Sequence, residues 1–300
     1  MVYKSSKQTE QKEKKLSYWS KTKCHCPVCR KDFPKEEMLT GGGRMIAGEL
    51  TDELHRVYEP SAKYGVIYPL LYSIGACPNC HSAFFWKDFE IINDNPSLNA
   101  LMDDCENRKK IVNNMFPYYQ LTRERNLLDG AAMYYLALLS YEKVDLEYAP
   151  TLKRAMISLR LAWLCKDLEK TVGHNYGFAA EVFYRKAQFF YEQTLINETQ
   201  RIETIAKVNN FGPDIDKNYG YDGVIYLNSL LEYKYGQTED MQMRLKKLDS
   251  NKRSIARIFG LGKSSKSKPG PLLEKSRELY DKLTEALKEA DVISFQDDEE

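Results

Sequence analysis

The sequence predicts a mainly α-helical protein with a small zinc-ribbon-like β module near its N-terminal end. Two Cys-Pro-x-Cys turns, Cys26-Pro27-Val28-Cys29 and Cys77-Pro78-Asn79-Cys80, place four thiols in the first third of the chain. From Asn95 onward, hydrophobic residues recur at intervals of three and four, which is typical of helices. Because these helices are rich in Tyr, Ala and Leu, we expect them to stack as helical hairpins in an α-solenoid.

The chain divides into four predicted regions. Residues 1–20 hold mostly Lys, Gln, Glu and Ser, with little to bury, and predict a disordered basic arm. Residues 21–94 are the zinc-ribbon-like module, and residues 95–290 the helical repeat-like domain. The acidic residues of 291–300 predict a disordered tail.

The two cysteine turns predict a structural metal site with Cys26, Cys29, Cys77 and Cys80 as ligands and Zn²⁺ as the ion. Two residues between cysteines let both sulfurs reach one metal, and the proline stiffens each turn. Four thiolates complete a tetrahedral set and leave no position for water, so such a site supports a fold and performs no reaction. Iron can occupy the same four sulfurs, and disulfides are the other alternative.

Neighbouring residues leave details of this site open. Glycine often follows a knuckle of this kind because the turn tends to need a positive φ, but Arg30 and His81 stand there. Their presence predicts local strain or a variant turn. Cys24 and His25 precede the first knuckle and are competing ligands, although we expect Cys24 to be a spare thiol. We expect His25 and His81 to lie around the site rather than to bind the metal.

Composition predicts a protein of the reducing cytoplasm. The 300 residues are 43% hydrophobic and 29% charged, with a net charge of +1, which argues against a dominant polyanion-binding role. The first twenty residues contain no apolar run of the kind that marks export. The longest apolar stretch, residues 64–77, is interrupted by Pro69 and is too short to cross a bilayer. In that compartment paired cysteines are more often metal ligands than disulfides.

Between the two knuckles the sequence predicts a loop, a helix and a strand. Three glycines at residues 41–43 indicate a loop beside the metal module. Thr51, with acids after it, predicts a helix start, and that helix ends near residue 58. Glu53 and His55 suggest a catalytic pair, but their spacing fits no metalloprotease motif, so we expect both to be surface residues, and a place near the knuckles is the alternative for His55. Residues 64–74 predict a strand.

Aromatic residues follow the second knuckle, and helices fill the rest of the chain. The run 83–86 predicts a cover that shields the metal from water, with a recognition surface as the alternative. Asn95, followed by Pro96, predicts a helix start. Helical periodicity covers residues 95–115, 122–141, 150–164, 178–208, 224–235, 239–259 and 272–290, with a linker at 260–271.

Two resemblances support this organisation. Residues 226–236 resemble the first helix and turn of a tetratricopeptide unit, although the helix starts are too unevenly spaced for a strict repeat. Residues 21–290 resemble an uncharacterised bacterial family, catalogued as domain of unknown function 2225. That resemblance rests on the two cysteine turns, on Gly43-Arg44, on residues 50–54 and on the Ala-rich helices. It implies a cytoplasmic zinc-ribbon-like module joined to tetratricopeptide-like helices, the four cysteines as ligands, and no assigned reaction.

The leading functional hypothesis is a non-enzymatic interaction protein that binds a protein or peptide on its helical surface. Candidates for that surface are polar and aromatic, although we expect most of the tyrosines to pack between helices: Tyr134, Tyr184, Arg185, Tyr191 and Tyr226. The alternative is an accessory protein that binds nucleic acid through the zinc module and residues 244–268, which hold nine Lys and Arg and one acid. We expect no enzyme: residues 260–264 end like a phosphate-binding loop, but Arg257 replaces its first glycine.

Overall fold

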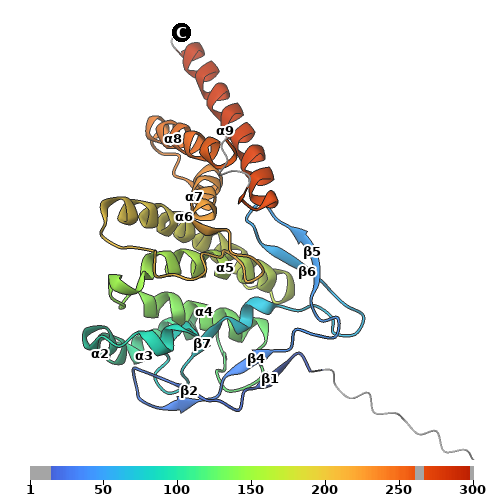
Figure 1. Ribbon diagram of the computed structural model, residues 1–300, viewed down its shortest axis with the longest axis vertical. Helices are drawn as coiled ribbons and strands as arrows, with labels where there is room; N and C mark the ends of the chain where they lie inside the picture. The colour runs from blue at the N-terminus through green and yellow to red at the C-terminus, as the bar shows by residue number, and fades with distance from the viewer. Residues whose placement is uncertain (1–14, 261–266, 298–300) are drawn as a thin grey trace, which may run out of the picture.

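The computed structural model describes residues 15–260 and 267–297, with side chains to residue 290. The fold is mainly helical, with small antiparallel strand pairs in the N-terminal part (Figure 1), which confirms the coarse prediction of fold class. Residues 1–14, 261–266 and 298–300, which belong to the predicted arm, linker and tail, lie outside the described residues.

The strands of the described part pair as short antiparallel ribbons. The pairs are β1 (Ser17–Trp19) with β4 (Glu36–Met38), β2 (Cys24–His25) with β3 (Asp32–Phe33), β5 (Ile46–Leu50) with β6 (Arg56–Glu59), and β7 (Ile74–Ala76) with β8 (Ala83–Phe85). The β2–β3 and β7–β8 hairpins each enclose one Cys-Pro-x-Cys turn. Their registers, Cys24 opposite Phe33 and Ala76 opposite Ala83, bring the two ends of each turn together.

The end of the predicted disordered arm is ordered. Ser17 Oγ donates a hydrogen bond of 2.5 Å to Glu36, whose buried carboxylate also lies 3.3 Å from the guanidinium of Arg125. A buried carboxylate needs such partners, so the hydrogen bond from Ser17 stabilises this end of the chain. The pairing of β1 with β4 also holds residues 17–19 in place. The prediction of disorder was therefore wrong for these residues.

The helix predicted from Thr51 to residue 58 is instead the turn and second strand of the β5–β6 hairpin. Thr51 Oγ1 accepts a hydrogen bond of 3.2 Å from the amide of His55, and the Thr51 amide donates to the His55 carbonyl at 2.9 Å. The hydroxyl therefore closes a tight turn rather than capping a helix. Leu54 adopts a φ of 57° in that turn and is fully buried, so tertiary packing outweighs the local helix-start pattern.

The strand predicted at residues 64–74 is also wrong over most of its length. A 3₁₀ turn, Pro69–Tyr72, occupies its C-terminal part, and β7 begins only at Ile74. Proline cannot donate to a β ladder and is well suited to the start of a helical turn, which explains why the strand is interrupted. Residues 41–43 form the predicted loop, with positive φ angles of 71° at Gly42 and 75° at Gly43.

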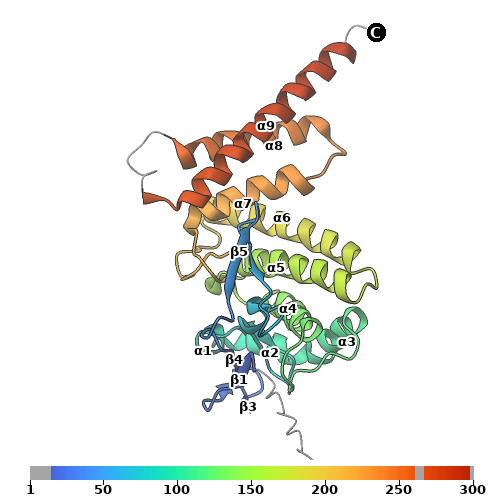
Figure 2. The same cartoon turned by 90° about the vertical axis from the view of Figure 1, so that its right-hand side faces the viewer.

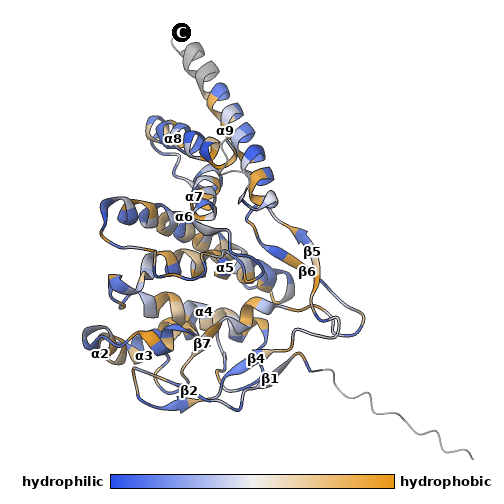
Figure 3. Cartoon of the chain, viewed as in Figure 1, coloured by the Kyte–Doolittle hydropathy of each residue, from blue (hydrophilic) through white to orange (hydrophobic). Residues whose placement is uncertain are grey.

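The helices follow in chain order and mostly pack on their sequence neighbours. They are α1 (Asp88–Ile91), α2 (Asn95–Asp103), α3 (Cys105–Met115), α4 (Leu127–Tyr141), α5 (Pro150–Thr171), α6 (Tyr176–Gln200), α7 (Gly220–Tyr235), α8 (Met241–Phe259) and α9 (Gly270–Asp297). From α4 to α9, each helix contacts the next, and Figure 2 shows them rising in layers from the strand pairs. Hydrophilic residues dominate α8, whereas hydrophobic residues are frequent in α4 (Figure 3).

Most predicted helices are present, with shifted ends. The segment 95–115 is divided at Asp104, and its cap is Asp94, whose carboxylate accepts from the Ser97 amide at 3.0 Å. Helix α6 ends at Gln200 rather than 208, because Arg201 turns left-handed with a φ of 58°. Residues 291–297 continue α9, so the predicted tail is helical over that stretch.

The tyrosines proposed for a recognition surface lie in the core. Tyr134, Tyr184, Tyr191 and Tyr226 are at most 1% exposed, whereas Arg185 is exposed. One continuous hydrophobic core extends from Cys26 to Leu283 and crosses residue 94, where the predicted module ends. The division of the chain at that residue remains a prediction.

Candidate metal centre

The two Cys-Pro-x-Cys turns have the same backbone geometry. In the first, the Arg30 amide donates to the Cys26 carbonyl at 2.9 Å, and the Cys26 amide donates to Lys31 at 3.0 Å. In the second, the His81 amide donates to the Cys77 carbonyl at 2.8 Å, and the Cys77 amide donates to Ser82 at 2.9 Å. Two turns distant in sequence therefore form equivalent halves of one structure.

Arg30 and His81 adopt the left-handed conformation that glycine usually supplies. Their φ angles are 60° and 56°. Each turn thus has the ordinary backbone of such a knuckle and is not a variant turn. The predicted strain arises because Arg30 and His81 adopt a left-handed backbone conformation that glycine tolerates better. A non-glycine residue in this region carries an unfavourable energy of roughly 1–2 kcal/mol.

The four cysteines meet at one point, which defines the cysteine clasp: Cys26, Cys29, Cys77 and Cys80. All four Sγ atoms lie within 4.8 Å of one another, and the pairs Cys26–Cys80 and Cys29–Cys77 are each 3.6 Å apart. A tetrahedral zinc with Zn–S bonds of about 2.3 Å sets its sulfurs about 3.8 Å apart, so the cluster can hold a metal ion. The hydrogen bond between Cys26 and Cys77 lowers the pKa of the Cys77 thiol and raises that of Cys26, so without a metal the cluster pairs a thiolate with a thiol.

The competing ligands do not join this cluster. Cys24 and His25 lie on β2, where the Cys24 thiol faces the His25 carbonyl at 3.8 Å and the His25 ring pairs with Asp32 at 2.8 Å. The His81 ring lies perpendicular to the Tyr119 ring, with 6.3 Å between centroids. Among the described residues, the clasp therefore consists of the four predicted cysteines.

A buried arginine that sequence reasoning missed supports the second knuckle. Arg108 of α3 is fully buried and donates to the carbonyls of Cys80 at 3.1 Å and Leu101 at 2.7 Å, and to Ser82 Oγ at 3.1 Å. Its charge is balanced by Asp104 at 3.2 Å. Because these donors hold the carbonyl of a ligand residue, Arg108 fixes the position of the Cys80 thiol from outside the clasp. A basic residue inside a helical periodicity gives no sequence sign of this role.

The residues after the second knuckle attach the clasp to the helices. The Ala83 amide donates to Ser140 Oγ, and the Phe85 amide donates to the Tyr141 hydroxyl, both at 3.1 Å. Phe84 is fully buried against Tyr141, in the same hydrophobic core as three of the clasp cysteines. Ala83 and Phe84 are therefore core residues, which fits the predicted cover better than a recognition surface.

Several basic residues in the described part of segment 244–268 have partners within the fold. Arg244 donates to the Tyr233 carbonyl at 3.0 Å, Lys247 pairs with Glu192 at 2.6 Å, and Arg253 pairs with Asp249 at 2.5 Å. These contacts reduce the charge left for phosphates, and nucleic-acid binding remains a prediction. Residues 261–264 of the rejected phosphate loop lie outside the described residues.

The fold and the clasp define a mainly helical protein with a four-cysteine cluster that can hold a metal ion. The chain belongs to the family described as an uncharacterised protein conserved in bacteria, domain of unknown function 2225, whose profile matches residues 19–283. It is similar to an uncharacterised protein of Borreliella burgdorferi, with 42% identity over 277 residues, which cover 92% of this chain and 99% of that relative.

No solved structure matches this chain. Within the described ranges, no helix has both the length and the apolar character that crossing a bilayer requires.

Proposed function

We propose that this chain is a non-catalytic binding protein of the cytoplasm, in which one structural Zn²⁺ in the cysteine clasp supports a solenoid-like stack of helices that binds a protein partner. The four sulfurs support a structural and non-catalytic metal, because a complete thiolate set leaves no open position for a substrate. The neighbour-on-neighbour packing from α4 to α9 supports a solenoid.

The observation that carries the partner proposal is an exposed apolar stripe on α6, which we call the α6 stripe: Phe178, Arg185, Phe189 and Ile196. These positions follow at intervals of seven, four and seven residues, so they lie along one face of the helix. Phe178 is 74% exposed, Phe189 54% and Ile196 39%. Large apolar side chains aligned in this way, with an arginine among them, are typical of protein interaction sites.

The test is affinity purification of the tagged full-length chain from its own bacterium. We expect the double variant Phe178→Ser with Phe189→Ser to lose partners that the wild type retains, because both apolar contacts are removed. Tyr118→Ser is the matched control, since Tyr118 is 88% exposed but lies outside the stripe. Equal retention by the double variant would refute the partner proposal.

A chelator arm tests the role of the metal in the same experiment. If the clasp supports the stack, a chelator that removes the ion should release the partner from the wild-type chain. Partner retention by a metal-free chain would separate binding from the clasp.

A further inference from the structure

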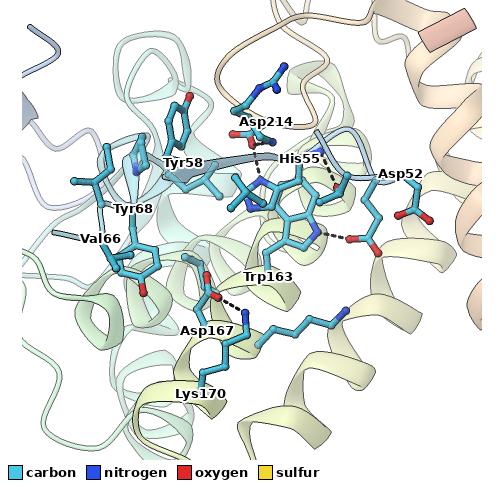
Figure 4. A pocket seen from close by; sticks show the side chains of 18 of the residues that line it. Asp52, His55, Tyr58, Val66, Tyr68, Trp163, Asp167, Lys170 and Asp214 are labelled. Atoms are coloured by element: carbon cyan, nitrogen blue, oxygen red, sulfur yellow. Dashed lines mark hydrogen bonds and ion pairs between the residues drawn. The ribbon is translucent and has the colours of Figure 1, made fainter. Parts of the chain in front are cut away.

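A cavity of about 410 Å³ lies between the β5–β6 hairpin and helix α5, away from the cysteine clasp. We call it the His55 cavity. Its apolar wall comes from the hairpin, from the segment that leads to the 3₁₀ turn, and from α5: Val57, Val66, Ile67, Tyr68, Pro69 and Leu164. Figure 4 shows His55 between Asp214 and Trp163, with Tyr58, Val66 and Tyr68 to one side. His55 is thus neither a surface residue nor near the knuckles, contrary to the sequence-based expectation.

One ring nitrogen of His55 is fixed by a buried carboxylate. Asp214, fully buried in the loop before α7, contacts His55 Nδ1 through Oδ2 at 2.5 Å. The same oxygen accepts from the Arg56 amide at 2.9 Å. Burial raises the pKa of Asp214, but the hydrogen bond with His55, the Ile215 amide and the charge of Arg160 outweigh this effect. The pKa of Asp214 is therefore below its usual value, and the carboxylate is ionised. With Nδ1 engaged, Nε2 is the ring nitrogen left for a ligand.

The floor of the His55 cavity is rigid. The His55 ring stacks on Trp163, with 4.0 Å between centroids and 14° between planes. Trp163 Nε1 donates to Glu53 Oε2 at 2.5 Å, and the Tyr184 hydroxyl donates to the same oxygen at 2.9 Å. Glu53 is thus buried and fully partnered, rather than exposed as predicted, and the Trp163 ring cannot rotate without breaking its bond to Glu53.

The acids that line the His55 cavity are already paired. Lys234 bridges Asp52 at 2.9 Å and Glu53 at 3.1 Å, and Lys170 pairs with Asp167 at 3.0 Å. Lys166 differs: among the described residues it has no carboxylate partner, and its ammonium lies 4.4 Å from the centre of the Tyr184 ring. Two uncommitted basic groups therefore remain on the lining, His55 Nε2 and the ammonium of Lys166, beside the hydroxyls of Tyr58 and Tyr68.

We propose that the His55 cavity binds a small molecule that carries one oxyanion, a carboxylate or a phosphate monoester, on an apolar body. When both ring nitrogens of His55 carry a proton, Nδ1 donates to Asp214 and Nε2 donates to the ligand, and Lys166 supplies a second cationic donor. The apolar wall receives the remainder of the molecule. The volume is in the range of ordinary small-molecule sites.

The test titrates the full-length, metal-bound chain with four probes: phenyl phosphate, phenylacetate, inorganic phosphate and benzyl alcohol. The readouts are the ring ¹⁵N resonances of His55 and the fluorescence of Trp163. We expect at least one of the two aromatic anions to give a saturable shift at His55 Nε2, and neutral benzyl alcohol to give none. Which anion binds more tightly distinguishes a carboxylate ligand from a phosphate ester, and weaker binding of inorganic phosphate shows the contribution of the apolar wall.

Variants separate the two uncommitted groups from general charge. Lys166→Met and His55→Gln should each weaken binding of the aromatic anion about tenfold, because each removes one charge-assisted contact. Lys186→Met is the matched control: Lys186 is exposed on α6 and does not line the cavity. The proposal is overturned if neither anion shifts His55 Nε2 up to about 10 mM, or if Lys186→Met weakens binding as much as Lys166→Met. Because the first criterion uses the wild-type chain, it holds even if a variant fails to fold.

Discussion

The cysteine clasp and the His55 cavity both join segments far apart in the chain, but they are held in different ways. The clasp brings together four like groups, which repel one another as thiolates unless a cation lies between them. In the cavity, each buried carboxylate meets its own donor from the protein, as Glu53 does with Trp163, Tyr184 and Lys234. The clasp should therefore depend on metal supply, and the cavity on hydrogen bonds that the polypeptide provides itself.

The largest expected effect is on the clasp. Cys77→Ser removes one of the four sulfurs, and a structural zinc contributes on the order of 10–16 kcal/mol, which equals or exceeds the net stability of a typical domain. We expect this variant to lose its metal and the ordered hairpins, as measured by metal content and circular dichroism. Cys105→Ser, which changes a cysteine outside the cluster, is the control. Cooperative unfolding of Cys77→Ser at the wild-type temperature would contradict the dependence on metal.

Arg108→Met tests whether support from outside the clasp matters. The variant leaves the carbonyls of Cys80 and Leu101 without their buried donor, so unfolding should require about 3–5 kcal/mol less free energy. Metal affinity should fall roughly 10- to 100-fold, as for loss of groups that orient a ligand. Urea unfolding and competition with a zinc chelator measure the two effects. Lys110→Met changes an exposed residue of the same helix and should do neither; if the two variants behave alike, Arg108 does not support the clasp.

Glu53→Gln breaks the cavity network and leaves the clasp intact. It removes the charge that faces Lys234 and replaces one accepting oxygen by an NH₂ group, so we expect a loss of about 2–3 kcal/mol in urea unfolding. The metal content should stay at the wild-type level, since Glu53 lies outside the clasp. A parallel loss of metal would mean that the two regions are not held independently.

Arg30→Gly should have the smallest effect, in the stabilising direction. Glycine removes the left-handed strain at a φ of 60°, and this gain is partly offset by the greater entropy of the unfolded chain. We expect an increase of about 0.5–1 kcal/mol in the free energy of unfolding with zinc bound. A decrease would show that the arginine side chain makes a stabilising contribution that outweighs the strain.

The same contrast explains what the sequence could predict. The clasp residues carry their own short motif, and helical periodicity located most helices, because both patterns are local. The cavity depends on partners separated by long stretches: Asp214 lies 159 residues after His55, and Trp163 lies 110 residues after Glu53. No local pattern encodes such contacts, and the capping motif at Thr51 predicted a helix where tertiary packing produces a hairpin. Arg108 was missed for the same reason, since its partners at Cys80 and Ser82 belong to another element.

Native mass spectrometry of the full-length chain, produced without added zinc, tests the central claim most directly. We predict a folded chain that carries one zinc ion, and a Cys26→Ser variant that carries none. A folded wild-type chain without metal, or one that carries iron in place of zinc, would contradict the account.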